Sequence, residues 1–114
     1  MLPMNTSHLA GKRCTPCGGG VPPLSVAQAM DLLRLVPRWS LEEGGRRIHR
    51  TIPCLDFRSA MKLAIQIGEI AEEEGHHPEI TVRWGECVVR IFTIKIDGLH
   101  ENDFIVAARI DELG

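Results

Sequence analysis

The apolar and polar positions of this 114-residue chain follow two periods, and together they predict helices and strands mixed within one domain. Apolar side chains recur at helical spacing over residues 26–36, 57–74 and 101–113. Strand-like alternation or continuous apolar character marks four short segments: 39–41, 48–52, 80–84 and 87–95. The resulting order is α, β, β, α, β, β, α. Two hairpins separated by a helix favour the α+β class, with a four-stranded antiparallel sheet and helices packed on one face.

Turn and capping residues set the predicted ends of these elements. Gly75 suits the C-cap of the long helix 57–74, and Pro78 prevents that helix from resuming. The pair Gly44-Gly45 suits a hairpin turn between the first two strands. Both faces of segment 87–95 are apolar, so this strand is expected at the centre of the sheet. The apolar stripe of helix 57–74 is broad, which is typical of a helix that serves both a core and a subunit contact.

The first 23 residues have a different character from the rest. They are rich in glycine and proline, which predicts an irregular arm (1–23) preceding the folded domain (24–114). Cys14 and Cys17 form a C-x-x-C pair, which is only half of a zinc ribbon because no second pair follows. We therefore expect reduced thiols and no metal site.

Charge and composition narrow the classes of partner. The formal net charge is −2 at pH 7, which gives no global reason to expect direct nucleic-acid binding. No apolar run approaches the roughly 18 residues that a membrane span needs. The start of the chain lacks the apolar stretch of a secretory signal. We therefore expect a small-molecule or protein partner and a cytoplasmic location, or an organellar one if the N-terminus is a trimmed targeting segment.

The stretch "EEEGHHPEI" carries the chemistry that stands out. His76 and His77 lie between the end of a helix and the start of a strand, so they occupy a loop held by rigid elements. Imidazole exchanges a proton near neutral pH, and Glu72 places a carboxylate four residues before His76. The set suits acid–base chemistry on a polar ring. Two other interpretations remain open: a solvated loop feature, and a metal site that lacks an evident third ligand.

The wider pattern resembles the pterin-4a-carbinolamine dehydratase family. The resemblance rests on Glu72, on His76-His77-Pro78, on Trp84 and on Asp103. The surrounding segments "CTPCGGGVPPLS", "RWSL", "DFRSAMKLAIQIGEIAEEEGHHPEI" and "DGLHENDFIVAARID" follow the family in register. The resemblance covers the chain from about Cys14 to its end.

This resemblance implies the αββαββα fold, dimers joined through sheet edges and tetramers paired through helices. It implies dehydration of 4a-hydroxytetrahydropterin to quinonoid dihydropterin, which recycles the pterin, without metal or organic cofactor. His76 and His77 would be the acid–base and substrate-positioning pair. The substrate-binding positions implied by the family are Glu72, Pro78, Thr93 and Asp103.

Two departures from the family stand out. Ile94 occupies the position of a third active-site histidine, and its side chain can neither transfer a proton nor hydrogen-bond a ring. His100 replaces the usual threonine or serine at a helix-capping position, where we expect histidine to be a poor cap and a possible auxiliary group for the missing imidazole. The alternative function is therefore a non-catalytic binding or assembly module with the same fold.

Overall fold

The computed structural model describes residues 9–12, 14 and 21–113. Over these residues the predicted order of helices and strands is confirmed. The elements are α2 (Val26–Leu33), β1 (Ser40–Glu42), β2 (Arg47–Pro53), α3 (Phe57–Glu74), β3 (Glu79–Arg83), β4 (Glu86–Ile91) and α4 (Glu101–Asp111). Short 3-10 turns follow β1 and β4: η1 (Glu43–Gly45) and η2 (Ile94–Ile96).

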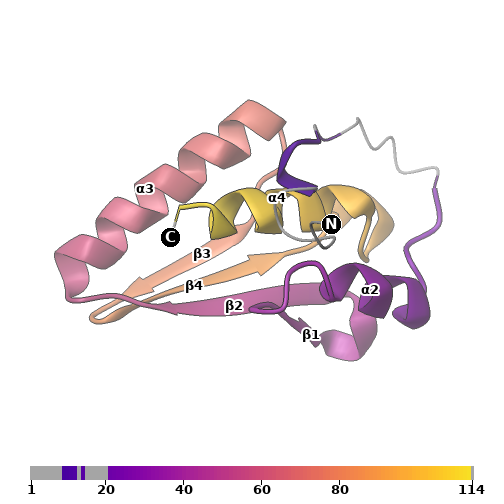
Figure 1. The fold of residues 1–114 in the computed structure, drawn as a ribbon, viewed down its shortest axis with the longest axis horizontal. Helices are drawn as coiled ribbons and strands as arrows, with labels where there is room; N and C mark the ends of the chain where they lie inside the picture. The colour runs from indigo at the N-terminus through magenta and orange to yellow at the C-terminus, as the bar shows by residue number, and fades with distance from the viewer. Residues whose placement is uncertain (1–8, 13, 15–20, 114) are drawn as a thin grey trace, which may run out of the picture.

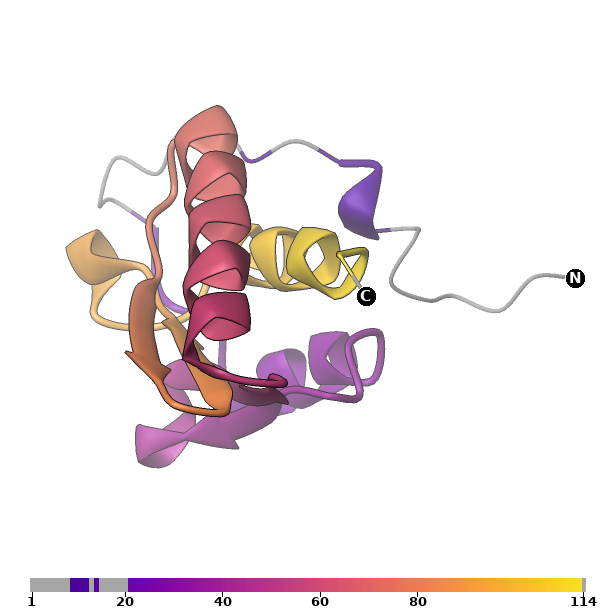
Figure 2. The same ribbon diagram turned by 90° about the vertical axis from the view of Figure 1, so that its left-hand side faces the viewer.

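The four strands form one antiparallel sheet in the order β1-β2-β4-β3. The apolar strand β4 therefore lies in the interior of the sheet, as its two apolar faces predict. Helices α2, α3 and α4 lie on one side of this sheet (Figures 1 and 2). The inward-facing residues of β4, at every second position, are fully buried: Cys87, Val89 and Ile91. The prediction of an α+β fold with helices on one face is confirmed.

Helix α3 has the predicted ends because both of its caps form. The Asp56 carboxylate accepts a hydrogen bond from the Ser59 N–H at 2.8 Å. Gly75 adopts a left-handed conformation with φ of 64°, and the His76 N–H donates to the Ala71 carbonyl at 3.1 Å. This closure of the helix end fixes the direction in which the chain leaves α3, and so the place of the two histidines that follow.

Helix α4 is buried on nearly every side, because it contacts both α3 and α2 while facing the sheet. Phe104 and Val106 are fully buried, and the polar residues Asn102 and Asp103 of its first turn are 3% and 0% exposed. Buried polar groups are tolerated only when they are hydrogen-bonded. The first turn of α4 is therefore a region where hydrogen-bonded polar side chains are buried inside the fold.

The chain after β4 differs from the prediction. The strand expected to reach residue 95 ends at Ile91, and Thr93 then pairs with Gly98 in an isolated antiparallel bridge. Between these two residues the chain makes the turn η2, which ends with Asp97 in a left-handed conformation at φ 47°. The turn was not predicted because the apolar residues continue through Ile96. Over so few residues, the apolar pattern of a strand cannot be told from that of a short 3-10 turn.

Smaller differences affect other predicted ends. Trp84 lies just beyond β3, in the turn to β4, and its side chain is 74% exposed. Helix α2 ends at Leu33 instead of residue 36, although Val36 is buried in the turn that follows. Helix α4 ends at Asp111, two residues before the predicted end. Among the described residues, the helices lack the length and apolar character required to cross a bilayer.

Candidate functional site

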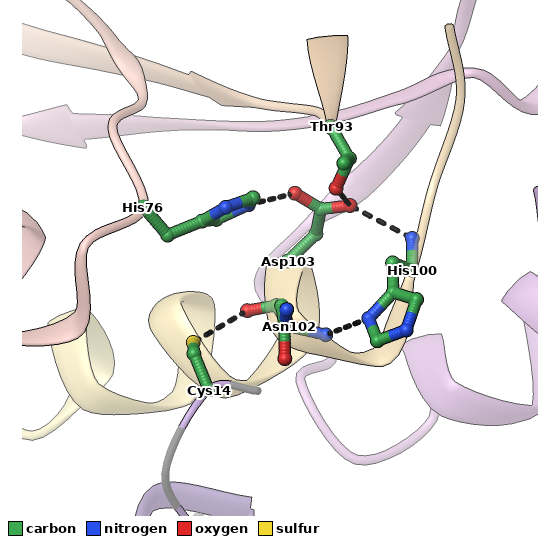
Figure 3. A network of polar contacts seen from close by, with 6 residues as sticks. All are labelled: Cys14, His76, Thr93, His100, Asn102 and Asp103. Atoms are coloured by element: carbon green, nitrogen blue, oxygen red, sulfur yellow. Dashed lines mark hydrogen bonds and ion pairs between the residues drawn. The ribbon is translucent and has the colours of Figure 1, made fainter. Parts of the chain in front are cut away.

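The loop after α3 and the first turn of α4 bring His76 and Asp103 together. The His76 Nε2 atom lies 2.5 Å from Asp103 Oδ1, and the two side chains are 13% and 0% exposed. Figure 3 shows the imidazole pointing directly at the carboxylate. Twenty-six residues separate the two in sequence, so only the packing of α3 against α4 creates this pair.

Asp103 is held by two further donors. The Thr93 hydroxyl donates to its Oδ2 atom at 2.9 Å, and the His100 backbone N–H donates to the same oxygen at 2.9 Å. The carboxylate therefore connects three segments by hydrogen bonds: the segment that follows β4, the N-terminus of α4 and the loop after α3. A buried carboxylate is stable only when its oxygens are satisfied in this way. Thr93 itself is 4% exposed, so it reaches the site through Asp103.

The neighbouring histidine makes a similar contact in a different environment. The His77 Nε2 atom lies 2.5 Å from Glu72 Oε2, but the two side chains are 62% and 77% exposed. An exposed pair of this kind contributes little to stability because water screens it. Pro78 is half-buried and leads the chain from His77 into β3. The structure thus places both histidines at one loop, one held by the interior and one facing solvent.

His100 caps helix α4, so the expectation that histidine is a poor cap is wrong here. Its Nδ1 atom accepts a hydrogen bond from the Asn102 N–H at 3.1 Å. Asp103 completes the reciprocal capping box by accepting from the His100 N–H. Asp103 lies between the His100 ring and the His76 ring (Figure 3). An auxiliary role of His100 in catalysis stays a prediction.

Ile94 is not part of a strand, although it lies within the predicted strand 87–95. It is the first residue of η2, and its side chain is 76% exposed. The alternation of side chains along a strand therefore cannot be used to orient it. It directly follows Thr93, which donates to Asp103, so its backbone lies next to the network around that carboxylate.

Glu74 belongs to this region, although it is not among the residues predicted from the sequence. Its side chain is 1% exposed, and its carboxylate accepts from Arg109 Nη1 at 2.6 Å. The Cys14 N–H donates to its other oxygen at 2.9 Å. One signal in the sequence could have found it: three consecutive glutamates at a helix C-terminus face the negative end of the helix dipole, so they need cationic or N–H partners.

The described residues contain no cluster of three metal-ligating groups. Cys17 lies outside them, so the predicted behaviour of the C-x-x-C pair is not tested. Cys14 itself donates through Sγ to the Asn102 carbonyl at 3.6 Å. Burial, followed by the negative charge of Glu74, raises the pKa of its thiol to about 12. This thiol is protonated at neutral pH and does not behave as a reactive thiolate.

A separate cavity of about 260 Å³ lies at the other end of α4. Its lining includes Arg50, Cys54, Ser59 and Ile110 but none of the predicted site residues. Arg50 there pairs with Asp111 at 2.5 Å, and the two side chains are 10% and 6% exposed. The paired charges support the fold between β2 and α4, and the cavity contains no group placed for acid–base chemistry with His76.

Comparison with known proteins identifies relatives along nearly the whole chain. Residues 22–113 match the model of the family described as Pterin 4 alpha carbinolamine dehydratase. A protein of Methylococcus capsulatus named "Putative pterin-4-alpha-carbinolamine dehydratase" is 49% identical over 96% of this chain and 96% of its own length. A protein of the same name from Azoarcus sp. is 45% identical over 94% of this chain and 92% of its own length.

The fold of this chain is also similar to that of a solved structure. The crystal structure of a transcriptional coactivator/pterin dehydratase from Brucella melitensis matches with a TM-score of 0.74 at 25% sequence identity. The match covers 80% of this chain and 97% of that one.

Proposed function

Because the chain belongs to the Pterin 4 alpha carbinolamine dehydratase family, we propose that it dehydrates 4a-hydroxytetrahydropterin to quinonoid dihydropterin. The observation that carries this proposal is the His76–Asp103 pair beside the exposed His77. A buried carboxylate that orients the imidazole of a loop histidine is an arrangement suited to proton transfer. A loop of purely structural use does not need it.

The reaction requires two coordinated proton movements. The C4a–O bond breaks, the hydroxyl leaves as water after gaining a proton, and N5 of the pterin loses a proton, so the net loss is one water. The Nε2–H of His76 donates to Asp103, which fixes the tautomer and leaves Nδ1 to accept the N5 proton. His77, in its protonated form, supplies the proton that the hydroxyl needs.

The remaining predicted residues have supporting roles in this proposal. Glu72 pairs with His77 at 2.5 Å and can accept hydrogen bonds from ring N–H groups of the pterin. Pro78 sets the exit of the loop. Because Thr93 and Asp103 are buried, we propose that they act through His76 as positioning residues instead of contacting the substrate.

The test is an assay of 4a-hydroxytetrahydropterin dehydration by the purified protein, with and without a chelator. We expect turnover above the uncatalysed rate, unaffected by the chelator, because the acid–base groups of the proposal are side chains. Dehydration at the uncatalysed rate, at substrate concentrations well above any measured binding constant, would refute the proposal.

We also propose that the chain self-associates through α3. The helix leaves an apolar stripe facing solvent, formed by Phe57, Met61 and Ile65 at four-residue spacing, with Leu55 just before it. Contiguous exposed apolar side chains of this kind mark contact surfaces. Ile65→Glu should give a smaller assembly than the native protein by light scattering, whereas Met30→Glu on α2, also an exposed apolar position, should leave the oligomer unchanged. A native protein that is monomeric at micromolar concentration would refute the self-association.

The same stripe supports a second candidate function, a binding or assembly module. The Brucella melitensis structure is titled a transcriptional coactivator as well as a pterin dehydratase, which joins both functions in one relative. The two candidates separate in the dehydration assay. If turnover is absent while Ile65→Glu still disrupts a complex with a protein partner, the binding function stands and the catalytic one does not.

A further inference from the structure

Three consecutive glutamates end α3, and the structure gives each a different environment. Glu72 and Glu73 have side chains that are 77% and 58% exposed, whereas the Glu74 side chain is 1% exposed. Burial of a carboxylate is costly unless it is paired and hydrogen-bonded. Glu74 is also only two residues before His76, so whatever fixes this carboxylate fixes the start of the histidine loop.

Within the part of the chain that the structure describes, two groups from distant segments hold Glu74. Arg109, on α4, donates through Nη1 at 2.6 Å and through Nη2 to Glu73 at 2.7 Å. The backbone N–H of Cys14 donates to the second oxygen of Glu74 at 2.9 Å. Helix α4 and the N-terminal segment, here residues 9–12, 14 and 21–24, therefore meet at one buried carboxylate.

The same N-terminal segment contacts the start of α4 at several other points. Cys14 Sγ donates to the Asn102 carbonyl, next to Asp103 (Figure 3). The Leu24 N–H donates to the Leu99 carbonyl at 2.8 Å, immediately before the helix. Leu9 is 1% exposed within the core.

A close backbone contact lies beside them. A Cβ atom at Gly98 would come within 2.6 Å of Pro23 Cβ, so glycine permits this approach. Because Gly98 also pairs with Thr93, the N-terminal segment packs against both chain segments that hold Asp103.

We propose that the N-terminal segment is part of the catalytic apparatus: Cys14 and Arg109 hold the Glu74 carboxylate and so keep His76 in contact with Asp103. Glu74 and Arg109 are then positioning residues, since they act through His76 and do not touch the substrate. This inference rests on the proposed dehydration for its kinetic consequence. Its geometric consequence, the state of the His76 ring, does not depend on that activity.

The first experiment compares two neighbouring substitutions in the full chain, Glu74→Gln and Glu73→Gln. Both remove a negative charge next to Arg109 and keep the size of the side chain. We expect Glu74→Gln to lower kcat about tenfold with KM changed less than twofold, because a small misplacement of an acid–base group costs rate more than binding. Glu73→Gln should leave both constants near the native values, since the Glu73 side chain is 58% exposed and its ion pair is screened by water.

The second readout is the pair of imidazole nitrogen NMR signals of His76, assigned by their loss in His76→Ala. Glu74→Gln should shift these signals because the contact of Nε2 with Asp103 loosens, whereas Glu73→Gln should not. A lower melting temperature with native kcat per folded molecule and unshifted His76 signals would show that Glu74 only stabilises the fold, and would overturn the proposal.

The third comparison isolates the N-terminal segment and serves if Glu74→Gln does not fold. Cys14→Pro removes the N–H that Glu74 accepts, whereas Cys14→Ala removes only the thiol. We expect Cys14→Pro to reproduce the shift of the His76 signals and the loss of kcat. Cys14→Ala keeps the N–H to Glu74, so we expect the His76 signals to stay unshifted in this variant. Equal behaviour of the two variants would overturn the role of the segment. If the native protein lacks dehydration activity, the proposed function fails alone, and the His76 signals still decide this inference.

Discussion

Two histidine–carboxylate pairs lie next to each other in this molecule. They share the same nitrogen–oxygen distance but differ in how far their side chains are exposed to water. His76 with Asp103 and His77 with Glu72 have the same 2.5 Å separation between ring nitrogen and carboxylate oxygen. The first pair spans two elements, and its side chains are 13% and 0% exposed. The second is local to the end of α3, and its side chains are 62% and 77% exposed. Distance alone therefore does not say what either pair does.

The difference in burial separates their roles. Charges that are exposed to water attract each other weakly, and exposed ion pairs contribute about 0–1 kcal/mol. A buried carboxylate that loses a partner leaves an uncompensated group inside the fold, which costs several times more. The buried pair is thus suited to hold an imidazole in one orientation, and the exposed pair leaves its imidazole free to meet a ligand. Catalysis by proton transfer benefits from both properties at one loop.

The largest effect is expected from the histidines themselves. His76→Ala and His77→Ala should each lower the dehydration rate by about 10²–10⁴. Their stabilities should differ, because only His76→Ala removes one of the partners of the buried Asp103 carboxylate, the one at Oδ1. We expect a loss of about 1–3 kcal/mol for His76→Ala and less than about 0.5 kcal/mol for His77→Ala. Kinetics and urea unfolding at one fixed protein concentration measure both quantities. Unchanged turnover in both variants would remove the acid–base role of this loop.

The carboxylates provide the next comparison. Asp103→Asn keeps the shape of the side chain but loses the charge that orients His76, so kcat should fall by about 10². It should also destabilise the protein by about 1.5–3 kcal/mol, because two donors besides His76 point at that carboxylate. Glu72→Gln should change stability by less than about 0.5 kcal/mol, since the pair is exposed. Similar losses of stability in the two variants would contradict the contrast between buried and exposed pairs.

The sequence predicted the frame of this site well because the signals there are local. Helix α3 has the predicted bounds, and Asp56 and Gly75 cap its two ends, since capping depends on a few adjacent residues. The central place of β4 followed from its two apolar faces. Both histidines were found because the loop they occupy is defined by these neighbouring elements. The family resemblance added Asp103, which no local pattern connects to His76.

What the sequence could not predict depends on long-range packing. Glu74 was one of three identical residues, and only the approach of Arg109 and Cys14 in three dimensions distinguishes it from its neighbours. The turn at Ile94 was hidden because the bridge between Thr93 and Gly98 is set by tertiary contacts. Capping by His100 was missed because propensity ranks side chains on average, whereas the ring nitrogen here happens to face an N–H.

Ile94 allows a third test, in which activity should rise. The side chain is 76% exposed, so Ile94→His should cost little stability. It adds an imidazole one residue from Thr93, next to the network around Asp103, and we expect a gain in kcat of up to about tenfold. Ile94→Gln is the matched control, because it adds a polar side chain that cannot exchange a proton at neutral pH. An equal effect of both substitutions would show that the gain is not due to acid–base chemistry.

The smallest expected effect concerns His100, which contacts Asp103 of the buried pair. Its ring nitrogen Nδ1 accepts a hydrogen bond from the Asn102 N–H and thereby caps α4. Its backbone N–H donates a hydrogen bond to the Asp103 carboxylate. His100→Ala removes the side-chain cap and should destabilise the protein by about 1 kcal/mol, because an N–H at the helix start loses its acceptor. The backbone contact to Asp103 remains, so kcat should fall less than about threefold.

A second variant separates capping from catalysis at this position. His100→Ser supplies a hydroxyl that caps well but cannot replace an imidazole in proton transfer. If His100 only caps the helix, His100→Ser should recover both stability and kcat, and the midpoint of urea unfolding should return with the rate. If His100 compensates for the missing histidine at position 94, His100→Ser should recover stability but not rate. In that case, His100→Ser should lower kcat less in the presence of Ile94→His than in the native protein, because two groups sharing one role give non-additive effects.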